Sequence, residues 1–307
     1  MTGIICLRKS ADMTSFQAVR IARAITGEKK AGHCGTLDPM ATGVLPVMLG
    51  GATRFLEYLP TTPKAYRAAL KLGVRTDTLD VTGTVLETAE VTVGRDDILA
   101  ALETFRGDIL QVPPMYSALK KDGVRMYELA RKGIEVERGA RPVTIDSLEL
   151  LPDGTDGTDP ESGEYVLEVS CSGGTYIRSL IDDLGAALGC GATMTALERT
   201  RVGVFTLDRA VTLDELEQAR DGGTLETHLL PVSEALSFLE AVSVTDAQAV
   251  RFRNGGALAL SRIHSRETGF PDGALFRVYD QANRFLGLGE VSSAEEELRV
   301  RRVFVDR

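Results

Sequence analysis

One carboxylate of this chain lies in a loop whose residue types would hold it rigidly. Residues 32–46 read GHCGTLDPMATGVLP and contain a single acid, Asp38. Gly35 and Gly43 allow backbone angles that other residues avoid, and Pro39 fixes a torsion directly after the acid. An Asp in such a turn most often only caps it. Rigid loops also carry catalytic groups, however, and a carboxylate can act as a nucleophile.

An arginine far along the chain lacks an obvious local partner. Arg178 lies in GGTYIRSL, near the start of an expected helix that Thr175 would cap. A cation in the first turn opposes the helix dipole at a cost of a few tenths of a kcal/mol, so a tertiary contact should compensate. Asp182 offers an i,i+4 pair, but Arg before Asp is the weaker orientation and contributes only ~0.3–0.5 kcal/mol. The alternative is a bidentate ion pair with Asp38.

A tyrosine lies on the apolar face of an expected strand. Residues 64–75 alternate so that Tyr66, Ala68, Leu70 and Leu72 share one side. An inward Tyr is most often part of the core, with its hydroxyl bonded to a neighbour. Its phenol has an ordinary pKa near 10, so it would need help to act as a base.

Together these segments resemble the motifs of the TruB family of pseudouridine synthases, over residues 4–205. The matching patterns are GHxGxLDPxAxGxL at 32–45, KxYxxxxxLG at 64–73, GTYIR at 174–178 and LRRTxxG at 197–203. The resemblance implies that the protein isomerises uridine 55 in the T loop of tRNA and that Asp38 is the nucleophile. It also implies that Tyr66 lies against the base as the favoured general base, and that Arg178 pairs with Asp38.

The same resemblance suggests further RNA-binding residues. His33 would help to flip the uridine and fill the vacated space, and Leu197 would line the base pocket; Thr36 is a further RNA-binding candidate. Flipping costs a few kcal/mol, of which stacking on Tyr66 could return ~1–3 kcal/mol. The expected phosphate contacts are Lys9, Lys29, Lys30 and the basic segment 113–142, although each such cation alone is more often a solvated surface charge.

Two positions depart from the family pattern. The usual LDKPxGxTS is LRKSADMTS at residues 7–15, which keeps Lys9 but lacks the Pro and the Gly. This puts the geometry of that turn in doubt. Glu198 replaces a usual Arg and removes one candidate phosphate contact.

The charge of the chain is unevenly distributed. The 307 residues carry a net charge of −9, which alone argues against an RNA partner. However, residues 1–80 hold 11 Lys and Arg against 6 Asp and Glu, whereas residues 143–240 hold 5 against 19. Phosphate contacts are local and screened over roughly 10 Å, so the basic N-terminal part remains compatible with RNA binding.

The pattern of elements favours an α+β fold with a mixed, mainly antiparallel sheet, because strands and helices mix without a βαβα rhythm. We expect strands at 4–7, 44–49 and 165–171, a helix between Thr14 and Gly27, and a helix from 177 to about 188. We assign residues 1–240 to a catalytic domain. Segment 113–142 would be an exposed basic insertion that resembles the family's thumb. Residues 241–307 resemble the family's small, β-rich RNA-binding domain of PUA type.

Several classes of protein are disfavoured. Scattered Cys residues and three His argue against disulfides and against a metal site, and we expect no cofactor. No apolar run is long enough to cross a membrane, and no signal peptide is evident, so we expect a cytoplasmic protein. Because no sustained apolar heptad is present, we also expect a monomer, and we expect no obligate protein partner.

The alternatives are an RNA-guided relative, an RNA chaperone without catalysis, and an Asp-based hydrolase. The hydrolase would need a second carboxylate beside Asp38. Whether Asp38 attacks the sugar, attacks the base or first forms a glycal is left open, as are RNA targets beyond tRNA.

Overall fold

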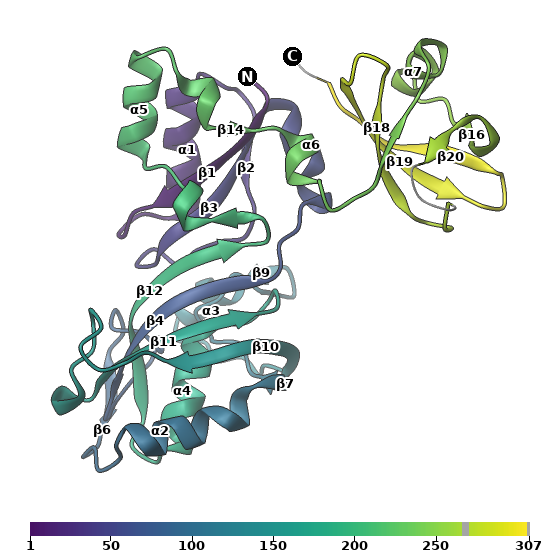
Figure 1. Cartoon of the computed structure of the whole chain (residues 1–307). Helices are drawn as coiled ribbons and strands as arrows, with labels where there is room; N and C mark the ends of the chain where they lie inside the picture. The colour runs from purple at the N-terminus through teal and green to yellow at the C-terminus, as the bar shows by residue number, and fades with distance from the viewer. Residues whose placement is uncertain (266–269, 306–307) are drawn as a thin grey trace.

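The computed structural model describes residues 1–265 and 270–305. Its main feature is a ten-stranded sheet in the order β14-β1-β3-β12-β4-β11-β10-β7, with β2 paired to β3 and β13 paired to β12 (Figure 1). Among the described residues, the neighbouring strands of this sheet run antiparallel except β3 and β12, which are parallel. The expected mixed, mainly antiparallel sheet is therefore confirmed.

The strands of this sheet have the following bounds: β1 Gly3–Lys9, β2 Ala31–His33, β3 Thr42–Leu49, β4 Lys64–Leu72, β7 Gly107–Gln111, β10 Arg141–Leu150, β11 Glu164–Cys171, β12 Ala192–Val202, β13 Phe205–Thr206 and β14 Leu229–Leu230. The helices are α1 Ser15–Thr26, α2 Arg95–Leu102, α3 Met126–Ala130, α4 Ile177–Ala187, α5 Leu213–Asp221, α6 Val232–Ala235 and α7 Asp246–Arg253. A 3-10 helix, η1 Gly50–Tyr58, follows β3.

Helix α1 begins and ends where its sequence predicts. Thr14 and Gln17 form a capping box, in which each side chain binds the other residue's backbone N–H. Gly27 ends the helix in the left-handed conformation, with φ 65°. Ala18, Ala22 and the neighbouring apolar residues of this helix pack against one face of the sheet.

Helix α4 begins differently from the prediction. Its N-cap is Tyr176, not Thr175, whose hydroxyl instead donates to the carbonyl of Ser172. The side chain of buried Gln111, at the end of β7, accepts from the backbone N–H of Tyr176 and donates to its carbonyl. A residue 65 positions away therefore fixes the start of this helix, which local sequence could not reveal.

Two apolar layers cover the two faces of the large sheet. One contains α1, α2, α4 and α5 against alternate residues of β1, β3, β4, β11 and β12. The other contains η1 and α6, and it includes Leu288 of a separate sheet formed by the C-terminal strands. Alternation along β4 buries Tyr66, Ala68, Leu70 and Leu72 as expected, but the strand ends at Leu72 rather than at residue 75.

Most of the segment 113–142 leaves the large sheet as an excursion of short elements, whereas its last two residues, Arg141 and Pro142, already belong to β10. It contains a two-stranded sheet, β8 Lys120–Lys121 with β9 Val124–Arg125, and helix α3. Lys120, Lys121, Arg125, Arg131 and Lys132 are all exposed on it. We call residues 113–140 the thumb; that this segment serves as the family's thumb stays a prediction. A second small sheet pairs β5 Val74–Thr76 with β6 Val85–Thr88.

A separate six-stranded sheet is built from the C-terminal strands, in the order β16-β20-β19-β18-β15-β17. Its strands are β15 Ala241–Ser243, β16 Leu258–Ala259, β17 His264–Ser265, β18 Leu275–Tyr279, β19 Phe285–Ser292 and β20 Glu297–Val303. Phe285 and Phe304 pack on Phe55 of η1, which joins this sheet to the rest of the molecule. The predicted division at residue 240 falls between the strands of the two sheets; independent folding of the two parts stays a prediction.

Within residues 1–265 and 270–305, none of the helices has the length and apolar character needed to cross a membrane.

Candidate active site

The loop that carries Asp38 is held from both sides by side chains of distant elements. The Ser15 hydroxyl, at the start of α1, accepts from the Leu37 N–H at 2.8 Å and donates to the Leu37 carbonyl at 3.1 Å. On the other side, Lys9 Nζ donates to the Pro39 carbonyl at 3.0 Å. The residues directly before and after Asp38, Leu37 and Pro39, are therefore both fixed by tertiary contacts.

Lys9 does not contact solvent, so its prediction as a phosphate contact is wrong. Its side chain is fully buried, and Nζ also donates to the carbonyls of Ser10 and Met13 at 2.8 and 2.7 Å. All three ammonium protons are thus used inside the protein. Asp12, which stands where the family motif has Gly, adopts φ 59°, so the turn keeps a left-handed residue.

Arg199 holds the first half of the loop. This arginine is 1% exposed, and its guanidinium donates to the carbonyls of Val44, Thr36 and Gly35 at 2.8, 3.3 and 3.0 Å. The contact depends on Gly43, where a Cβ would lie 2.2 Å from the Arg199 carbonyl oxygen. Any side chain at this position would separate β3 from β12 and move the loop.

The predicted partner of Asp38 is in place, but the pairing is not bidentate. Arg178 Nε lies 3.0 Å from Asp38 Oδ2. Its Nη1 donates to the Thr78 carbonyl at 3.0 Å, and its Nη2 donates to the carbonyl of Tyr116, in the thumb, at 2.8 Å. One buried guanidinium therefore joins the acid, the β5–β6 region and the base of the thumb. Asp182, the local alternative, pairs with Arg75 instead.

Sequence reasoning missed a second carboxylate at this site. Asp80 Oδ2 lies 3.6 Å from Arg178 Nη1, and the Asp80 side chain is 6% exposed. Its Oδ1 accepts from the hydroxyls of Thr78 and Thr82. The signal was the dense run TDTLDVTG at 76–83, in which two Asp and three Thr precede a Gly, as is typical of a polar turn with buried contacts.

The pKa of Asp38 is raised above its ordinary value. Burial is the main cause, Arg178 and Lys9 oppose it, and the charge of Asp80 adds to it. About a third of the side chain (36%) is exposed. Asp38 is therefore a partly desolvated carboxylate, open on one side and paired on the other with a buried cation that opposes the rise in its pKa, which suits a nucleophile.

Tyr66 lies on β4, with Arg199 as its register partner on β12. Its side chain is 7% exposed. Burial raises the pKa of Tyr66 to about 12, although the Arg199 guanidinium opposes this shift. The phenol is thus protonated at neutral pH.

The chain matches three family models that follow one another along its length. They are the TruB family pseudouridylate synthase N-terminal domain at residues 23–177, the tRNA pseudouridylate synthase B C-terminal domain at 178–237, and the pseudouridine synthase II TruB C-terminal domain at 241–304. The chain belongs to the TruB family of pseudouridine synthases.

Curated relatives and solved structures agree with this family. The chain is 45% identical to tRNA pseudouridine synthase B of Clostridium perfringens, over 94% of this chain and 95% of that protein. It is 47% identical to the Pseudomonas putida protein of the same name, over 95% and 92%. A chain of a Cbf5-Nop10-Gar1 complex superposes with a TM-score of 0.73 at 29% identity, covering 99% of this chain and 85% of that one. A chain of an H/ACA RNP bound to a substrate RNA containing 2′-deoxyuridine gives 0.72 at 27%, covering 99% and 86%.

Three further residues that the TruB resemblance suggested lie on β2, on β12 and on the Asp38 loop. His33 ends β2. Burial is the main reason that the pKa of its imidazole is lowered, and the lower pKa favours the neutral form. Leu197 is buried on β12, where Thr42 donates to its carbonyl. Thr36 is exposed on the loop itself. Their contacts with RNA remain predictions.

Lys29 and Lys30 are not brought to the Asp38 loop. Both are exposed and precede β2, whose first residue, Ala31, pairs with Leu49 at the far end of β3. The loop that carries Asp38 adjoins the opposite end of that strand. The two lysines therefore belong to another part of the surface.

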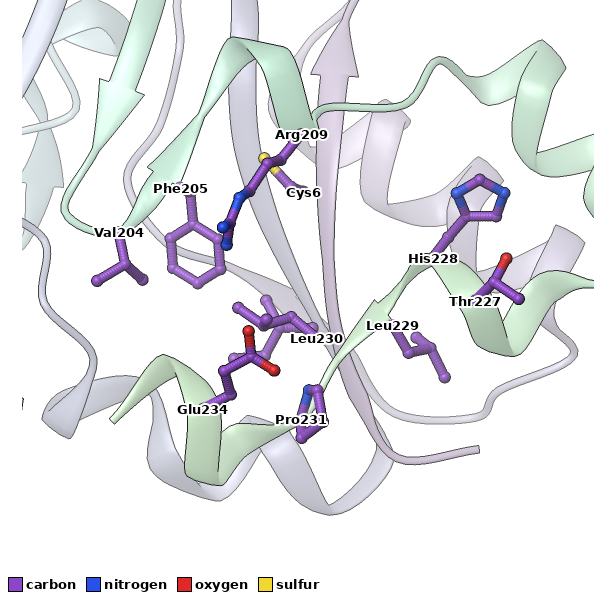
Figure 2. A pocket seen from close by; sticks show the side chains of 11 residues that line it. Cys6, Val204, Phe205, Arg209, Thr227, His228, Leu229, Leu230, Pro231 and Glu234 are labelled. Carbon is purple, nitrogen blue, oxygen red and sulfur yellow. The ribbon is translucent and has the colours of Figure 1, made fainter. Parts of the chain in front are cut away.

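A cavity of about 300 Å³ lies apart from this site, between β14, α6 and the turn after β12. Figure 2 shows Cys6, Arg209, His228 and Glu234 among its lining side chains, none of which the sequence singled out for chemistry. Burial raises the pKa of the Cys6 thiol to about 12, so it is not a reactive thiolate. Over residues 1–265 and 270–305, no group of three or more His, Cys, Asp or Glu side chains is placed to hold a metal ion.

Proposed function

We propose that this pseudouridine synthase isomerises uridine 55 in the T loop of tRNA, with Asp38 as its nucleophile. The observation that carries this proposal is the ion pair between Arg178 and Asp38, in a loop held by three buried cations. The names of relatives at 44–47% identity, which cover nearly the whole chain, support the choice of substrate.

The reaction breaks the N1–C1′ glycosidic bond and forms a C5–C1′ bond to the same base. The proton on C5 must leave, and N1 must gain one, so the reaction is neutral in atoms and electrons. A carboxylate that holds a covalent intermediate splits this change into easier steps. Asp38 suits attack on C1′, attack on the base, and prior formation of a glycal.

Tyr66 would lie against the flipped base and take the C5 proton. A phenol with a pKa of about 12 yields little phenolate at neutral pH, so the proton transfer needs the nearby Arg199 guanidinium to stabilise the developing charge. His33, Thr36 and Leu197 would contact the flipped nucleotide or its neighbours. The thumb, anchored to Arg178 through the Tyr116 carbonyl, would close over the T loop with its exposed cations.

We also propose that the protein works as a cytoplasmic monomer without an obligate protein partner or cofactor. Its identity to the tRNA pseudouridine synthase B proteins (44–47%) exceeds its identity to the chains of the H/ACA complexes (27–29%), which favours the stand-alone enzyme over the RNA-guided relative. Light scattering of the protein with and without tRNA tests the monomer.

Release of tritium from C5-labelled uridine in an unmodified tRNA transcript tests the function. We expect release by the native protein, none by Asp38→Asn, and none from a transcript in which uridine 55 is replaced by cytidine. Both proteins should bind the tRNA. Binding without release by the native protein would support an RNA chaperone, and equal release by both proteins would exclude Asp38 as the nucleophile.

A further inference from the structure

A second basic surface lies at the far end of β3 from the catalytic loop. Lys29, Lys30 and Arg54 line a cavity of about 490 Å³, together with Glu28, Thr53, Gly50, Gly51 and Val305. The three cationic side chains are exposed. We call this surface the terminal cleft, because residues from near both ends of the chain contribute to its walls.

The terminal cleft is too far from Asp38 to bind the same nucleotide. Strand β3 runs from Thr42, beside the catalytic loop, to Leu49, beside Gly50. Seven steps of roughly 3.3 Å along an extended strand span about 23 Å. A ligand that reaches both places must be a macromolecule of at least that length, and the RNA of the proposed reaction is such a molecule.

Within residues 1–265 and 270–305, the positive charge of the cleft is not neutralised by ion pairs. Among the described residues that line it, the one carboxylate, Glu28, accepts from the N-terminal ammonium at 3.1 Å and from the Lys29 N–H at 2.9 Å. The first of these contacts is the main reason that the pKa of Glu28 is lowered. In the described part of the chain, no salt bridge involves Lys29, Lys30 or Arg54. These cations are therefore available to an external anion.

The shape of the cleft is fixed by two glycines. Gly50 has φ 57°, and a Cβ there would lie 2.6 Å from the Met1 carbonyl oxygen. A Cβ at Gly51 would lie 2.4 Å from the Val305 carbonyl oxygen. The first residues of the chain and the strand-following segment at Val305 thus both pack closely on this turn, which makes a preformed hollow rather than a flat basic patch.

We propose that the terminal cleft binds backbone phosphates of the substrate tRNA outside the T stem-loop. This inference rests on the proposed function for the identity of the RNA. A phosphodiester would provide an anionic partner for the three cations, and a folded tRNA is long enough to reach both the terminal cleft and the catalytic loop. The cleft would then add affinity for whole tRNA without touching the target loop.

Equilibrium binding of two RNAs tests this inference, using full-length tRNA and its isolated T stem-loop. In Lys29→Ala/Arg54→Ala we expect the Kd for tRNA to rise about tenfold and its salt slope to fall by roughly 1 to 2. The Kd for the stem-loop should change less than twofold. The matched control is Arg209→Ala/Arg220→Ala, which also removes two exposed cations, from elsewhere on the surface, and should leave both values unchanged.

Three results would overturn the inference: unchanged tRNA binding, an equal loss for tRNA and stem-loop, or an equal loss in the control. The variants are compared only after their urea unfolding curves match that of the native protein, so an equal loss for both RNAs does not reflect poor folding. Tritium release is measured separately. If the native protein is inactive but the cleft variant still loses affinity for tRNA and not for the stem-loop, the catalytic proposal is refuted and the assignment of the terminal cleft stands.

Discussion

The cations around Asp38 are buried and bonded within the protein, whereas those of the thumb are exposed to solvent. Lys9, Arg178 and Arg199 are 5% exposed or less, and they donate to carbonyls of the loops around the site. Lys120 and Lys132 of the thumb are exposed and take part in no salt bridge within the described residues. Buried cations thus fix the backbone and the ionisation of Asp38, whereas exposed cations remain free to bind phosphate. Positive charge near an RNA site is therefore not by itself evidence of RNA contact.

The largest effect that this comparison predicts is for Arg178→Ala. The change leaves two nearby carboxylates, Asp38 and Asp80, without their shared cation. We expect tritium release to fall by about 10⁴-fold or more. The free energy of unfolding, from urea titration, should fall by about 3–5 kcal/mol, the cost of breaking a buried pair by removing one partner. Substantial activity in this variant would contradict the role of the ion pair.

Tyr66→Phe should have the next largest effect, because it keeps the ring and removes the hydroxyl. We expect the single-turnover rate to fall by about 10²–10⁴-fold, as is usual for loss of a general base. The Kd for tRNA should change less than threefold, since stacking on the ring remains. A native rate in this variant would mean that the Tyr66 hydroxyl is not the general base.

The pH dependence of the reaction should report the raised pKa of Asp38. The nucleophile must be ionised, so kcat/KM should fall tenfold per pH unit below a pKa that lies above the ordinary value for Asp. Asp80→Asn removes a charge that raises this pKa, so the acid limb should move to lower pH, whatever the rate at its plateau. An unmoved limb would show that another group controls it.

The same raised pKa has a consequence for stability. Because the folded-state pKa lies above the unfolded value, the ionised carboxylate costs stability at neutral pH, and this cost disappears as the pH falls through the folded pKa. Asp38→Asn should therefore unfold at the same or a higher temperature than the native protein at pH 7.

Lys9 and a thumb lysine form a matched pair for stability. Lys9→Met leaves the carbonyls of Ser10, Met13 and Pro39 without their donor. We expect a loss of about 3 kcal/mol in the free energy of unfolding. Lys132→Ala, at an exposed position, should change this value by less than about 0.5 kcal/mol. Equal losses would erase the distinction between buried and exposed cations.

Much of the fold and the core of the site could be predicted from sequence because the information is local. Alternation places Tyr66 on the buried face, the capping box starts α1, and the motifs identify Asp38 and Arg178. What failed depends on tertiary contacts. Lys9 resembles a surface lysine until three carbonyls surround it, and nothing local to Thr175 reveals that Gln111 fixes the next residue.

The positions of Asp80 and Arg199 have the same explanation. Each is buried by elements distant in the chain, and a strand or turn sequence alone does not state which charged residue faces inward. The Gly43 position was identified, but its reason, the close approach of the Arg199 backbone, is visible only in the paired strands.

One measurement on the native protein tests the central distinction most directly. The Kd for tRNA and the single-turnover rate at saturating protein are measured across a series of salt concentrations. Exposed charges are screened over roughly 10 Å at 0.1 M salt, and buried pairs much less. We predict that the Kd rises steeply with salt while the saturated rate stays constant. A saturated rate that falls as steeply as the affinity would contradict the account, because the cations that hold Asp38 would then be open to solvent.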